Sequence, residues 1–90
     1  MEIDVFDTYV THQDGHKMHF DVLLPKGNTQ EQAKGYAIKW LKRMGMEIEG
    51  IQLDSCRFCH SESAFPEMEQ TINSQGFAIL QMEGCPAPIH

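Results

Sequence analysis

Apolar and polar residues alternate twice near the N-terminus, over residues 3–10 and again over residues 17–24. Alternation with a period of two is typical of a strand with one buried face. Asp14 and Gly15 lie between the two stretches and are the preferred sequence of a two-residue type I′ turn. The pattern therefore predicts a β-hairpin.

The length of the turn decides which residues face one another in this hairpin. A two-residue turn places Tyr9 opposite Phe20, and this side of the hairpin is then the expected core face. Asp7 also falls on that face, which is the weakness of this register. A three-residue loop places Asp7 directly opposite Asp21 instead. Because two carboxylates in that position repel, we favour the two-residue turn.

A helical spacing follows the hairpin. Apolar residues recur every three or four positions between residues 29 and 44, with cations in the last turn and Gly45 after it. This stripe predicts a helix that packs on the sheet, and it consists of Ala33, Tyr36, Ala37, Trp40, Leu41 and Met44. Pro66 at the start and Gly76 at the end predict a second helix.

Two further short strands are expected over residues 48–53 and 77–82, each directly after one of the helices. A strand, helix, strand unit normally returns as a right-handed parallel crossover. The ββαβαβ order therefore predicts a four-stranded mixed sheet, formed by the N-terminal hairpin and the two crossovers. We expect a single two-layer α/β domain over residues 1–90, with both helices on one face of the sheet.

The composition is that of an ordinary globular domain, with 41% hydrophobic and 22% charged residues and no apolar run that is long enough for a membrane span. Thirteen acidic and seven basic residues give a net charge of −6. This charge repels nucleic acids and anionic lipids, so we expect neither as a partner. The acidic N-terminus does not resemble a secretory signal, which predicts a cytoplasmic protein.

Candidate chemistry concentrates in a Cys-x-x-Cys-His sequence that runs from Cys56 to His60. If the last two strands run parallel, Cys56 and Cys59 leave the sheet at the same edge as Cys85. Three converging thiolates predict a zinc site, because zinc prefers sulfur ligands in a tetrahedron. His60 is a candidate for the fourth ligand, although its position next to Cys59 makes simultaneous ligation awkward.

Three other interpretations of these cysteines stay open. The pair also suits thiol redox chemistry, since Arg57 and His60 favour a thiolate. The same sequence is the attachment pattern of c-type haem, but that attachment normally follows export. The plainest interpretation is that the thiols only pack in the interior.

A second polar cluster consists of His16, His19, Asp21 and Asp7, all on the predicted hairpin. A histidine beside carboxylates can act as a general base or as a metal ligand, or it can simply form hydrogen bonds on a polar face. No Ser-His-Asp arrangement or glycine-rich phosphate loop is recognisable. The sequence therefore favours no class of enzyme.

The face of the hairpin opposite the expected core carries Phe6, Val10 and Leu23 among polar residues. A surface of this kind is too apolar to face water alone. It predicts an interaction surface, and a homodimer through these three side chains is the partner that we expect.

Several short motifs also carry a resemblance to a family. Residues 7–10 (DTYV), 15–22 (GHKMHFDV), 56–62 (CRFCHSE) and 82–85 (MEGC) together resemble the small bacterial proteins catalogued as domain of unknown function twenty twenty-four. The resemblance covers nearly the whole chain and implies a compact α/β domain. The family has no assigned activity, so the resemblance implies no catalytic residue.

Overall fold

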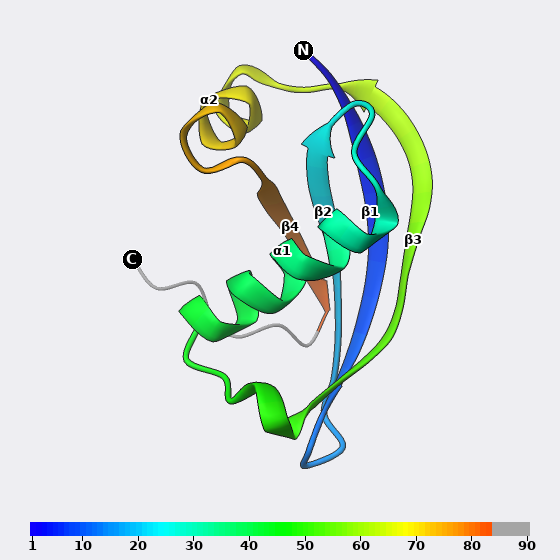
Figure 1. Ribbon diagram of the computed structural model, residues 1–90, viewed down its shortest axis with the longest axis vertical. Helices are drawn as coiled ribbons and strands as arrows, with labels where there is room; N and C mark the ends of the chain where they lie inside the picture. The colour runs from blue at the N-terminus through cyan, green and yellow to red at the C-terminus, as the bar shows by residue number, and fades with distance from the viewer. Residues whose placement is uncertain (84–90) are drawn as a thin grey trace.

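The computed structural model describes residues 1–83, and it contains a four-stranded sheet with two α-helices (Figure 1). The elements are β1 (Glu2–His12), β2 (Lys17–Pro25), α1 (Gln30–Arg43), a short 3-10 helix (Ile48–Gly50), β3 (Ile51–Ser63), α2 (Pro66–Gln75) and β4 (Ala78–Glu83). Both strands of the hairpin and both α-helices therefore form where the sequence predicts them. None of the helices within residues 1–83 has the length and apolar character that crossing a membrane requires.

The order of the strands in the sheet is β3-β1-β2-β4, and every neighbouring pair is antiparallel. The predicted mixed sheet is therefore wrong. The hairpin occupies the centre, β3 adds to the free edge of β1, and β4 adds to the free edge of β2. Helix α1 connects two strands that point the same way, but β1 lies between them, so no adjacent parallel pair forms.

The hairpin closes through three loop residues, and its predicted register is wrong by one residue. Gly15 adopts a φ of 88°, a left-handed conformation that suits the last position of a three-residue loop. The backbone N–H of His12 donates to the carbonyl of His16 at 2.7 Å, which fixes the closing pair. As a result, Asp7 faces Asp21 directly across the hairpin, the arrangement that charge repulsion argued against.

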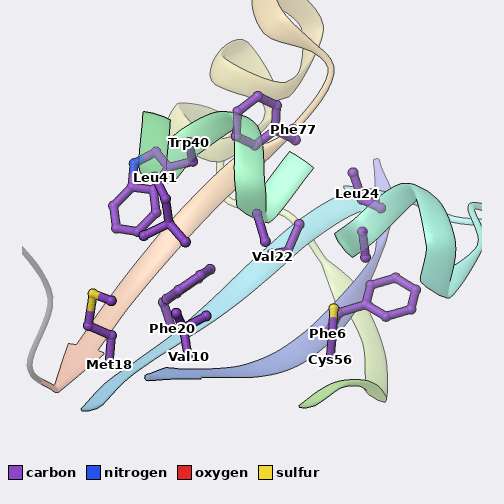
Figure 2. Packing of buried hydrophobic residues seen from close by; sticks show 12 residues of the cluster. Phe6, Val10, Met18, Phe20, Val22, Leu24, Trp40, Leu41, Cys56 and Phe77 are labelled. Atoms are coloured by element: carbon purple, nitrogen blue, oxygen red, sulfur yellow. The ribbon is translucent and has the colours of Figure 1, made fainter. Parts of the chain in front are cut away.

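Helix α1 covers one face of the sheet, which we call the inner face (Figure 2). The apolar stripe of the helix packs there as predicted, with Phe20 of β2 against Trp40 at a ring-centroid distance of 4.9 Å. The helix begins at Thr29, whose hydroxyl accepts a hydrogen bond from the backbone of Gln32 at 3.2 Å. The buried side chains of this core are Phe6, Val10, Met18, Phe20, Val22, Leu24, Ala33, Ala37, Trp40, Leu41, Cys56 and Phe77.

Helix α2 packs on the opposite face, which we call the outer face. Ile72 of this helix forms a second apolar cluster with Ile3, Val5 and Leu23, which alternate along β1 and β2 with the residues of the inner core. The prediction that both helices share one face is therefore wrong. A short helix at each face suits a sheet in which both faces of the central strands carry apolar residues.

The three side chains that were expected to form a dimer surface are buried within their own chain. Phe6 and Val10 lie on the inner face under α1, and Leu23 lies under α2. None of the three is more than 2% exposed. The one-residue shift of the hairpin explains the error for Phe6 and Val10, because it moves the side chains of β1 to the other face. Leu23 stays on the outer face and is buried there because α2 covers it.

Candidate metal centre

The cysteine pair lies within strand β3 and not in a loop beyond it. An extended strand rises about 3.3 Å per residue, so Cys56 and Cys59 are about 10 Å apart along the chain. Two sulfurs on one zinc ion lie only about 4 Å apart. Both thiols are free. The structure therefore does not bring Cys56 and Cys59 together, and the third predicted ligand, Cys85, lies outside the described residues.

The environments of these two thiols also differ. Cys56 lies in the inner core and is 1% exposed (Figure 2). Its sulfur accepts a hydrogen bond from the Thr8 hydroxyl at 3.4 Å. Burial raises the pKa of the Cys56 thiol, and the hydrogen bond from Thr8 opposes this only in part. Cys59 is exposed, at an irregularity in the pairing of β3 with β1. A protonated, buried thiol is a poor ligand and a poor nucleophile.

His60, the predicted fourth ligand, faces outward next to Cys59. It pairs with Val5 in the β1–β3 ladder, and its Nε2 atom lies 3.6 Å from a carboxylate oxygen of Glu62. The side chain is about half exposed. Unlike the cysteines and His60, residues of the second polar cluster lie close together in the structure.

Three members of that cluster converge on the outer face of the hairpin. Asp7 on β1 faces Asp21 on β2, and His19 stands two residues before Asp21 on the same side of its strand. One ligand atom from each residue lies within 4.8 Å of the other two. The Nε2 atom of His19 is in direct hydrogen-bonded contact with Oδ1 of Asp7. His16, the fourth predicted member, is exposed at the end of the hairpin loop and does not join this group.

The two carboxylates of this cluster are close enough to change their protonation. Asp21 is only 7% exposed. Its burial, followed by the negative charge of Asp7, raises the pKa of Asp21 to about 6. His19 acts in the opposite direction and offsets part of this effect. The repulsion between Asp7 and Asp21 that the sequence indicated is therefore present in the structure, where the two residues face one another.

Asp4, which precedes Asp7 on β1 and faces the other side of the strand, is a second buried carboxylate. Its oxygens accept hydrogen bonds from the Ser61 hydroxyl at 2.6 Å and from the backbone of Gly27 at 3.1 Å. The bond from Ser61 is the largest cause that lowers the pKa of Asp4. Asp21 has the opposite shift, and perturbed carboxyl groups of this kind are concentrated at functional sites.

The flank of the cluster is shaped by an aromatic ring. Tyr9 stacks on the imidazole of His19, with ring centroids 4.1 Å apart and planes only 8° from parallel. This stack, together with the contact to Asp7, fixes the orientation of the His19 ring. Next to it lies a hollow of about 380 Å³, which is lined by Tyr9, Lys17, Met18, His19 and Glu83.

One imidazole nitrogen and two carboxylate oxygens form a mixed donor set. Imidazole suits zinc and the neighbouring first-row metals, and carboxylates are common further ligands of the same ions. Three protein ligands leave at least one coordination position for water or a ligand. The sequence did contain a signal for this arrangement, because a three-residue loop places Asp7 opposite Asp21. We treated the repulsion between them as an argument against that loop and not as an indication of a binding site.

Comparison with known proteins places the chain in a family. The model of the family described as Domain of unknown function (DUF2024) matches residues 1–82. The chain belongs to this family. The NMR structure of protein NE1680 from Nitrosomonas europaea, at 44% sequence identity, superposes with a TM-score of 0.80 and covers 94% of this chain and 99% of its own. A search of the curated proteins finds no match. The DUF2024 resemblance seen in the sequence is confirmed.

Proposed function

We propose that this DUF2024 protein binds a divalent first-row metal ion through Asp7, His19 and Asp21, and zinc is the ion that we would test first. The observation that carries this proposal is the approach of three donor atoms to within 4.8 Å of one another on two adjacent strands. The sheet itself holds these residues, so little ordering is needed for an ion to bind.

The distances fit such an ion after small side-chain rotations. Zinc lies about 2.0–2.2 Å from oxygen and nitrogen ligands, so two of its ligands stand about 3.3–3.6 Å apart. The three donor atoms lie within 4.8 Å of one another, and the short contact between His19 Nε2 and Asp7 Oδ1 has to widen before both atoms can bind one ion. An ion with two positive charges also cancels the repulsion between Asp7 and Asp21, so binding removes an unfavourable interaction of the metal-free protein.

The burial of the cluster adds to its affinity. Asp21 is largely shielded from water, and the Asp7 and His19 side chains are about one third and one quarter exposed. Attraction between an ion and a carboxylate is stronger where water is partly excluded. The Tyr9 ring covers one side of His19 and keeps its Nε2 atom directed at Asp7.

The test is zinc titration of chelator-treated protein, followed by calorimetry and by elemental analysis after gel filtration. The wild-type protein is expected to bind one zinc ion. Asp7→Asn replaces a carboxylate with a neutral amide, and His19→Gln removes the imidazole nitrogen. Each is expected to weaken binding at least about 100-fold, because even residues that only orient ligands contribute about 10- to 100-fold.

The matched control removes the thiols instead of the cluster. A Cys59→Ser/Cys85→Ser double variant retains the hairpin donors and is expected to bind zinc as the wild-type protein does. Zinc binding that is lost in this control and retained in the hairpin variants would assign the ion to the cysteines. A wild-type protein that binds no zinc contradicts the proposal outright.

A further inference from the structure

Arg57 borders the cluster on the β3 side of the sheet. It lies on β3 directly opposite Asp7 of β1, and cross-strand partners have their side chains on the same face. An arginine in that position would ordinarily pair with the aspartate. Asp7 instead contacts His19 and Asp21, and within residues 1–83 the exposed Arg57 side chain forms no ion pair or hydrogen bond.

A second cation lies on the other side of the cluster. Lys17 stands two residues before His19 on the outward side of β2 and lines the hollow of about 380 Å³. The chain has only seven basic residues against thirteen acidic ones. Two of the seven therefore border the candidate metal centre, on a protein whose overall charge repels anions.

We propose that the open coordination position of the ion takes a small molecule through a carboxylate or phosphate group, and that Arg57 holds this group. The inference rests on the proposed metal site and names the class of ligand that the site takes. A divalent ion with two carboxylates is neutral, and Arg57 makes the position next to it positive. Guanidinium binds carboxylate and phosphate through two parallel hydrogen bonds, which also fixes the orientation of the ligand.

A hollow next to His19 limits the size of the organic part of the ligand. It is lined by Tyr9, Lys17, Met18, His19 and Glu83, and Arg57 lies outside this lining. Pockets for small molecules usually have volumes of about 300–1,000 Å³, and this hollow is near the lower end. Its apolar boundary is the Tyr9 ring, which is 43% exposed on the same face. An oxyanion with a small organic part therefore fits better than an extended polymer.

The experiment uses the full chain loaded with cobalt(II), whose visible absorption reports changes in its ligands. Oxalate and inorganic phosphate are titrated separately, and the cobalt content is measured again after gel filtration. We expect at least one of the two anions to shift the absorption bands while the ion stays bound. The anion that does so identifies the group as a carboxylate or a phosphate.

Two matched variants test the role of Arg57. Arg57→Gln is expected to weaken anion binding about 10-fold or more, since it removes a charge-assisted pair of hydrogen bonds. It leaves cobalt affinity unchanged or slightly higher, because a nearby positive charge is lost. Lys39→Gln removes an exposed cation from α1, beyond the inner face of the sheet, and is expected to change anion affinity less than about 2-fold.

The possible failures are distinguishable. Cobalt that binds but shows no spectral response to either anion overturns the inference and leaves the metal site in place. Equal effects of the Arg57 and Lys39 variants, or removal of cobalt by the anion, overturn the inference as well. A wild-type protein that binds no cobalt overturns both the metal site and its ligand.

Discussion

The outer face of the sheet has two halves that the same two strands build in different ways. At one end, Ile3, Val5 and Leu23 are buried under α2. At the other end, Asp7 and His19 are partly open to water and no helix among residues 1–83 packs on them. The residues of both halves alternate along β1 and β2 with the same inner core. The two halves therefore differ in exposure because α2 covers only one of them, while the strands continue through both.

The lengths of the elements explain this division. Strand β1 has 11 residues and spans about 36 Å, whereas α2 has 10 residues and spans about 15 Å. One short helix cannot cover the whole face. The covered half can carry apolar side chains that contribute to stability, and the open half is available for charged groups that bind a ligand. The stabilising apolar cluster and the candidate metal centre are thus separated along a single pair of strands.

The largest expected effect lies in the covered half. Leu23→Ala removes a side chain that is 2% exposed beneath α2, and we expect it to lower the free energy of unfolding by about 2–4 kcal/mol, as buried leucines do. The measurement is urea unfolding. Leu80→Ala is the control from the open half, because Leu80 is 44% exposed and lies opposite Asp21. It is expected to cost less than about 1 kcal/mol, and an equal cost would show that the two halves do not differ as described.

A smaller effect of opposite sign is expected for Asp21→Asn in chelator-treated protein. The pKa of Asp21 is raised in the folded state from 3.8 to about 6, so its ionised form is disfavoured there. Its contribution to stability is fully present below about pH 4 and is lost as the pH rises through 6. Two pKa units correspond to at most about 3 kcal/mol, which exposure of the neighbouring groups to water reduces. We expect the variant to be about 1–2 kcal/mol more stable at pH 7.5 and little changed at pH 4.

Asp4→Asn is the matched control for this prediction, because the shift has the opposite direction. Hydrogen bonding to Ser61 lowers the pKa of Asp4, so its carboxylate stabilises the fold above the unfolded pKa and this stabilisation is lost in acid. The Asp4 variant should therefore lose stability at pH 7.5. If both variants change stability in the same direction at that pH, the difference between the two carboxylates is refuted.

The smallest effect is expected at Tyr9. Removing the ring in Tyr9→Ala takes away the stack on His19, and we expect a loss of about 1 kcal/mol or less from an exposed position. Zinc affinity should also fall by about 10-fold, because the imidazole loses a contact that orients it. Tyr9→Phe retains the ring and should behave like the wild-type protein in both measurements. A large fall in stability in Tyr9→Ala would place this residue in the stabilising half.

Local sequence signals were sufficient for the hairpin strands and the two α-helices. The apolar stripe that includes Trp40 predicted α1, and Pro66 with Gly76 bounded α2. The positions of these helices depend on residues that are close together in the sequence. The order of the strands depends on pairing between segments that are far apart in the sequence, which the periodicity of one segment does not encode. Strands β3 and β4 each pair antiparallel with one strand of the hairpin.

The candidate site was predicted only in part, for two physical reasons. Asp14-Gly15 is compatible with loops of two or three residues, and the choice between them decides whether Asp7 points inward or meets Asp21. The Cys56 to Ser63 stretch lacks the alternation of a strand, yet it pairs with β1 except at the irregularity at Cys59. In both places tertiary contacts outweigh the local preference.

The central position of the hairpin has a consequence for how the sheet assembles. Its two strands comprise the first 25 residues, and a local hairpin forms on the microsecond time scale, before strands from later in the chain are available to pair with it. All three proposed ligands lie within residues 7–21. The candidate metal centre therefore lies within one local hairpin, so an ion that binds there would stabilise the template on which β3 and β4 later assemble.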